Sequence, residues 1–159
     1  MFPLKKIVAP TDFSKPSLEG LRNAIELAEK FNAELIIVYV IEPPVWSGLA
    51  YSPTGYNPPD ITESLKEEAM KNLDKLQSEM IPENIPYRLL TLEGKPADQI
   101  VSFSDEQAAN MIVIATHGYS GFHRFVFGSV TERVVRTATC PVLTIRPQSL
   151  KKDSNHSGA

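Results

Sequence analysis

Residues 111–147 read MIVIATHGYSGFHRFVFGSVTERVVRTATCPVLTIRP. An apolar run leads into a glycine-rich loop that ends at Gly128 and Ser129, and a helical pattern and a second apolar run follow. At such a junction, unpaired backbone N–H groups and the positive end of the helix dipole point the same way and attract anions. This stretch therefore predicts a nucleotide-binding α/β protein.

The rest of the chain continues the alternation of strand and helix patterns. Short apolar runs predict strands at Leu4–Ala9, Leu35–Ile41, Tyr87–Leu92, Met111–Ala115 and Pro141–Ile145. Apolar residues at helical spacing separate these runs, and the expected helices begin at Ser14, Asp60, Pro96 and Ser129. The irregular, proline-rich stretch from Pro43 to Pro59 is expected to form a loop.

This alternation predicts a single-domain α/β fold with a five-stranded parallel sheet, order 3-2-1-4-5, and helices on both faces. Such a sheet reverses its winding beside the first strand, and ligands bind outside the carboxyl ends of the strands that flank the reversal. Those ends are Pro10-Thr11-Asp12 and Ala115-Thr116-His117-Gly118. The topology and the glycine-rich loop therefore predict the same ligand site.

Length and composition narrow the class of protein. The 159 residues suffice for one domain, which we expect at residues 1–147, ahead of a polar, disordered tail at residues 148–159. A net charge of −3 and the lack of a basic run outside the tail argue against nucleic acid as a partner. The single cysteine, Cys140, excludes an internal disulfide. No apolar run is long enough to cross a membrane, and the N-terminus reads as a strand rather than a signal peptide, so we expect a cytoplasmic protein.

The chain resembles the universal stress protein family from Lys6 to Arg146. The resemblance rests on VAPTDFS, on IVIATHGYSG, and on FGSVTERVVR followed by CPVLTI. The ATP-binding branch of that family has the pattern G-x2-G-x9-G-[ST], and its four named positions are occupied here by Ala115, Gly118, Gly128 and Ser129. The spacing is kept, although alanine replaces the first glycine. The resemblance implies a Rossmann-like fold of the adenine nucleotide alpha hydrolase-like type.

The resemblance also implies a function. The protein is expected to bind ATP, ADP or AMP as a stress-response binding or regulatory module, and to form a homodimer through Val142–Ile145. Mg²⁺ is expected only together with the phosphates, because Arg124 is the one lysine or arginine between Gly118 and Gly128. The alternative is a stress protein that binds no nucleotide and acts as a dimeric interaction module. The alanine at position 115 keeps this alternative open.

Phosphate contacts are expected where the loop meets the helix. The loop glycines let successive N–H groups wrap a phosphate, and the glycine before the helix leaves that helix end open. A serine and an arginine add a hydroxyl and a positive charge. Ser129 is also expected to form an S-x-x-E capping box with Glu132. The expected contacts are Gly118, Gly121, Arg124, Gly128, Ser129 and the backbone of Val130.

The opposite side of the site is expected to hold the base and the ribose. Asp12 can accept hydrogen bonds from ribose hydroxyls or adenine, or help to hold Mg²⁺. Pro10 and Thr11 shape the adenine side, and Val40 matches a family position that touches the base. Ala115, Thr116 and His117 complete the strand end. We expect a polar contact from His117 rather than a metal bond, because no carboxylate or cysteine cluster accompanies it.

Other functions find less support in the residues. The segment GYSGF lacks the second glycine of a G-x-S-x-G nucleophile elbow, since Phe122 stands there. A signalling receiver would need a phosphoacceptor aspartate at the end of the third strand, where Glu93 stands, and a lysine after the last strand, where Arg146 stands. The chain also lacks a P-loop motif. No nucleophile, base and orienting group are recognisable as a set. We therefore expect a nucleotide-binding protein rather than an enzyme, with slow ATP hydrolysis left open.

Overall fold

The computed structural model describes residues 3–42, 62–116 and 127–147. The elements follow the chain in the order β1 (Lys6–Pro10), α1 (Lys15–Phe31), β2 (Glu34–Ile41), α2 (Thr62–Met80), β3 (Tyr87–Glu93), α3 (Pro96–Glu106), β4 (Met111–Ala115), α4 (Ser129–Thr137) and β5 (Val142–Ile145). This is the predicted alternation of strands and helices. The Pro43–Pro59 loop, the expected cap Asp60 and the tail at residues 148–159 lie outside the described residues.

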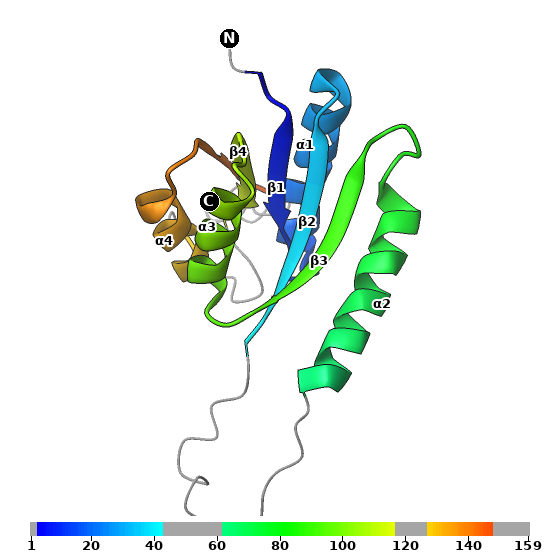
Figure 1. Ribbon diagram of the computed structural model, residues 1–159, viewed down its shortest axis with the longest axis vertical. Helices are drawn as coiled ribbons and strands as arrows, with labels where there is room; N and C mark the ends of the chain where they lie inside the picture. Colours follow the sequence, from blue (N-terminus) through cyan, green and yellow to red (C-terminus); the bar gives the residue numbers. More distant parts are fainter. Residues whose placement is uncertain (1–2, 43–61, 117–126, 148–159) are drawn as a thin grey trace, which may run out of the picture.

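The five strands form one parallel sheet in the order β3-β2-β1-β4-β5, which confirms the predicted topology (Figure 1). Strand β1 lies in the middle: Ile7 pairs with Leu35 of β2 on one side and with Met111 of β4 on the other. The winding reverses here, because the connections of the two halves run outward in opposite directions from β1. The ends of β1 and β4 therefore flank the crevice that this topology creates.

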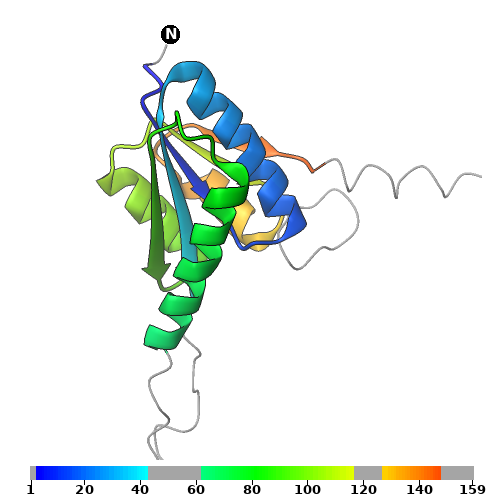
Figure 2. The same cartoon turned by 90° about the vertical axis from the view of Figure 1, so that its right-hand side faces the viewer.

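Helices cover both faces of the sheet. Helices α1 and α2 pack on one face, where Ile7, Leu35 and Val113 join the same apolar cluster. Helices α3 and α4 pack on the other, where Val8 and Ile112 belong to a second cluster. Figure 2 shows the sheet between these helix layers from the side. Since successive strand residues face opposite layers and both layers exclude water, the central strands are apolar at nearly every position.

The ends of the first helix follow local signals that the sequence contains. Ser14 caps α1, and its hydroxyl accepts a hydrogen bond from the backbone N–H of Ser17 at 3.3 Å. The helix ends at Asn32, which adopts a left-handed conformation with φ of 50°. Strand β1 begins two residues later than predicted, at Lys6 rather than Leu4. The backbone N–H of Lys5 bonds to the side chain of Asn110 instead of a neighbouring strand.

Candidate functional site

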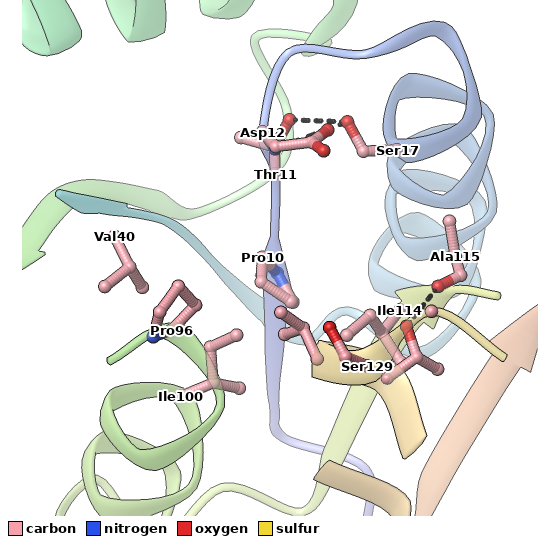
Figure 3. Close-up of a pocket in the computed structure, with 13 residues that line it drawn as sticks. Pro10, Thr11, Asp12, Ser17, Val40, Pro96, Ile100, Ile114, Ala115 and Ser129 are labelled. Carbon is pink, nitrogen blue, oxygen red and sulfur yellow. Dashed lines mark hydrogen bonds between the residues drawn. The ribbon is translucent and has the colours of Figure 1, made fainter. Parts of the chain in front are cut away.

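A cavity of about 280 Å³ opens at the carboxyl ends of β1 and β4, the predicted position of the ligand site. Figure 3 shows side chains from several separate segments around it. Of the residues expected from the sequence, those that border the cavity are Pro10, Thr11, Asp12, Val40, Ala115, Gly128, Ser129 and Val130. The sequence reasoning missed five further lining residues, which are Ser17, Pro96, Ile100, Ile114 and Thr131.

One wall of the cavity is apolar. Val40 comes from the end of β2, and Pro96 and Ile100 come from the first turns of α3 (Figure 3). Ile114 from β4 belongs to the same apolar cluster as Ile100. A wall of aliphatic side chains can pack against the face of a flat ring. Such packing removes apolar surface from water and leaves no polar group buried without a hydrogen-bond partner. The apolar pattern of Ile114 was visible in the sequence, but nothing in its local pattern distinguished it from ordinary core.

The polar groups gather at the turn between β1 and α1. The hydroxyls of Thr11 and Ser17 lie 3.1 Å apart in a buried hydrogen bond, and the backbone N–H of Thr11 bonds to the carbonyl of Val38 at 2.9 Å. Asp12 accepts a hydrogen bond from the backbone N–H of Ser14 at 3.0 Å through its Oδ1. These bonds hold the turn in one conformation and keep the Asp12 carboxylate at the cavity.

Phe13, within this turn, carries backbone strain. Its φ is 61°, a left-handed conformation that residues other than glycine rarely adopt. The ring stacks on Tyr39 of β2 with centroids 4.9 Å apart, and the backbone N–H of Phe13 bonds to the Thr11 hydroxyl at 3.0 Å. These contacts offset the strain and fix the backbone next to Asp12.

The loop after β4 starts and ends at adjacent points. The backbone N–H of Thr116 bonds to the carbonyl of Ile145 at 2.8 Å, and the backbone N–H of Gly128 bonds to the carbonyl of Thr116 at the same distance. The buried hydroxyl of Thr131 donates to the carbonyl of Ala115 at 2.8 Å. The end of β4 is thus tied directly to the start of α4. Thr116 does not line the cavity itself.

The start of α4 differs from the prediction in one respect. The N-cap is Gly128, with φ of −58°, and Ser129 is the first helical residue, so the expected capping box of Ser129 and Glu132 is wrong. A capping box requires the serine one position earlier, at the N-cap. Glu132 instead forms an ion pair with Arg136 one turn along the helix, with 3.7 Å between Oε1 and Nη1. Because no side chain caps the start of α4, the N–H groups of Ser129 and Val130 remain open at the cavity.

Several expected residues cannot be placed at this site. His117, Gly118, Gly121 and Arg124 lie outside the described residues. Within the described ranges, no three His, Cys, Asp or Glu side chains come together as metal ligands, and no helix is long and apolar enough to span a bilayer. Cys140 packs against the apolar cluster under α3 and α4, and burial raises the pKa of its thiol. A raised pKa disfavours the reactive thiolate.

The fold and the cavity define a class of protein: an α/β protein with a ligand cavity at the switch point of a parallel sheet and an open helix N-terminus beside it. The sequence profile of the universal stress protein family matches residues 3–146. The chain therefore belongs to the universal stress protein family, as the motifs predicted.

Known relatives agree with this assignment. Universal stress protein MJ0531 of Methanocaldococcus jannaschii is 39% identical over 142 residues, which cover 89% of this chain and 82% of the relative. The structure of hypothetical protein MJ0577 matches with a TM-score of 0.72 at 24% identity, over 92% of this chain and 98% of that one, and supports the fold. A universal stress protein from Archaeoglobus fulgidus, solved in complex with dAMP, matches with a TM-score of 0.58 at 26% identity, over 91% and 99%.

Proposed function

We propose that this protein binds an adenine nucleotide (ATP, ADP or AMP) at the ends of β1 and β4 and acts as a binding or regulatory module in the stress response. The observation that carries the proposal is the cavity itself, which joins an apolar wall to an open helix N-terminus. An apolar wall suits the flat face of a base, and a helix N-terminus suits a phosphate. The dAMP complex of the Archaeoglobus relative supports the same class of ligand.

The lining residues suggest how such a ligand would lie. The base would rest against Val40, Pro96 and Ile100, and the ribose hydroxyls would donate to the carboxylate of Asp12. The phosphates would accept hydrogen bonds from the N–H groups of Ser129 and Val130. We place His117, Gly118, Gly121 and Arg124 around the same phosphates, on the basis of the family pattern. Mg²⁺ would arrive with the phosphates of a triphosphate.

We infer a binding role rather than catalysis. Of the described residues that border the cavity, Asp12 alone is ionisable at neutral pH. A hydrolytic site needs a positioned base together with a nucleophile or metal-bound water. Asp12 already accepts a hydrogen bond from the Ser14 backbone, which suits a carboxylate that holds a hydroxyl in place.

We also propose a cytoplasmic homodimer that pairs through β5. This strand lies at one edge of the sheet, and Leu143 within it is 36% exposed. A free apolar strand edge recruits a second strand, and antiparallel pairing of two copies would satisfy both edges. If the site binds no nucleotide, this interface becomes the basis of the alternative function, a dimeric interaction module.

Two measurements test nucleotide binding. The purified protein is denatured, and the released small molecules are analysed by mass spectrometry; titration calorimetry with ATP, ADP and AMP then gives the affinities. We expect Gly128→Glu to abolish binding while the circular dichroism of the helices stays unchanged. The added carboxylate would cover the first N–H groups of α4 and repel phosphate.

Matched variants separate this effect from a general loss of structure. Gly128→Ala should bind nearly as well as the wild type, because φ of −58° suits any residue and the N–H groups stay free. Val135→Glu adds the same charge at an exposed position of α4 and should bind normally. Binding by Gly128→Glu at wild-type affinity would refute the site.

A further inference from the structure

We propose that Gly20 and Ala115 form a size-matched pair across α1 and β4, and that Gly20 is thereby a positioning residue for the nucleotide site. Gly20 lies outside the expected site and borders no part of the cavity. Its role follows from a close approach between the helix and the strand. The inference rests on the proposed nucleotide binding and assigns part of it to a residue on the first helix.

Helix α1 approaches β4 closely at Gly20 and Ala115. Gly20 is buried in α1, and a Cβ atom added to it would lie 3.1 Å from the backbone N of Ala115, 3.2 Å from its Cβ and 3.4 Å from its Cα. Figure 3 shows Ala115 beside α1. Real Cβ atoms are seldom this close to other atoms, and backbone atoms cannot swing aside as the end of a long side chain can. A side chain at position 20 would therefore push against the β4 strand itself.

This geometry explains how the chain accommodates alanine at the first glycine of the family pattern. The Ala115 methyl group points toward α1, into space that remains free because residue 20 has no side chain. The residue is 4% exposed, so the methyl group is packed rather than solvated. One small side chain fits between helix and strand, and this protein places it on the strand.

Hydrogen bonds connect Ala115 and the residue after it to the start of α4, on the proposed phosphate side of the site. Its carbonyl accepts the hydrogen bond from Thr131 of α4, at 2.8 Å. The next residue, Thr116, is bonded through its carbonyl to the backbone N–H of Gly128, the N-cap of α4. A displacement of Ala115 by a few tenths of an ångström would therefore move the helix start that we propose binds phosphate. Hydrogen-bonded contacts of this kind are sensitive to small displacements.

A double-mutant cycle tests the pairing. The four proteins are the wild type, Gly20→Ala, Ala115→Gly and the variant with both changes, in which the methyl group moves from strand to helix. For each, calorimetry measures the Kd for ATP, and urea denaturation measures stability. We expect Gly20→Ala to weaken binding about tenfold, a coupling in the range found for residues in contact. The double variant should recover most of that loss, because it again holds one methyl group between α1 and β4.

The control is Glu26→Ala, an exposed change on the same helix that does not face β4. It places alanine in α1 at a position away from β4, and it should leave the Kd unchanged. If the wild type binds ATP and Gly20→Ala binds equally well, the positioning role is wrong while the proposed function stands. A double variant no better than Gly20→Ala would also overturn the pairing. If the wild type binds no adenine nucleotide, the proposed function itself is wrong and the positioning role falls with it.

Discussion

At the scale of single residues, Phe13 shows that the turn between β1 and α1 contains backbone strain. A phenylalanine with φ of 61° is strained, yet its ring stacks on Tyr39 and its backbone N–H is bonded to Thr11. The strain and the stacking act in opposite directions on stability, and different substitutions can separate them. Residues held in such conformations are often found where a site needs a fixed backbone.

We predict that Phe13→Ala destabilises the protein more than Phe13→Gly, by about 1 kcal/mol in the free energy of unfolding. Both changes remove the stacked ring, but only glycine relieves the left-handed strain. Urea denaturation followed by circular dichroism measures the difference. Tyr39→Leu removes the ring contact without altering position 13 and serves as the control. Equal stability of the alanine and glycine variants would show that the turn relaxes to another conformation.

At the scale of secondary structure, two of the helices that border the cavity, α1 and α4, begin in different ways. Helix α1 has a side-chain cap at Ser14, whereas α4 begins at Gly128 with no side-chain cap. The S-x-x-E pattern favoured a cap at Ser129, but a glycine one position earlier took the N-cap. A capped start gives stability, and an uncapped start leaves N–H groups for a ligand. Helix α4, which has no side-chain cap, is the helix next to the proposed phosphates.

We predict that Ser14→Ala lowers the free energy of unfolding by about 1 kcal/mol, the usual cost of removing an N-cap. The interaction lost is the hydrogen bond that the Ser14 hydroxyl accepts from the Ser17 backbone N–H at the buried start of α1. The matched control is Ser78→Ala in α2, an exposed serine within a helix, where stability should not fall. Chemical denaturation of the three proteins gives the comparison. A loss as large for Ser78→Ala would contradict the capping role.

At the scale of the whole molecule, the sheet has two edge strands with exposed apolar residues. Leu143 lies on β5 and Tyr87 on β3, and they are 36% and 39% exposed. Strand β5 is short and carries no charged residue between Val142 and Ile145, whereas β3 carries Arg88 and Glu93. Charges on an edge strand discourage pairing with another copy. We therefore place the proposed dimer contact at β5 rather than at β3.

We predict that the wild type elutes as a dimer and that Leu143→Lys is a monomer, because a lysine on the edge strand would place a charge within the pairing interface. Size-exclusion chromatography with light scattering measures the mass. Tyr87→Lys on the opposite edge is the matched control and should remain a dimer. A monomeric wild type would rule out the proposed interface, and so would dissociation by Tyr87→Lys alone.

The sequence by itself was sufficient for the order of strands and helices, the topology and the edge of the sheet that forms the cavity. The reason is that hydrophobic periodicity and turn residues are local signals, and a parallel α/β order leaves few permitted topologies. Asp12 and Gly128 could be expected to border the cavity in this way, since both lie at the ends of elements.

Only the tertiary structure decided which residues complete the cavity and how its parts are held. Pro96 and Ile100 join the wall because α3 packs beside β2 and β4, and their own neighbours in the sequence carry no sign of it. The sequence around Gly20 and Ala115 likewise carries no sign that these two residues, far apart along the chain, lie close together. Contacts of this kind depend on strand register and on the distance between packed layers, which no local pattern of residues specifies.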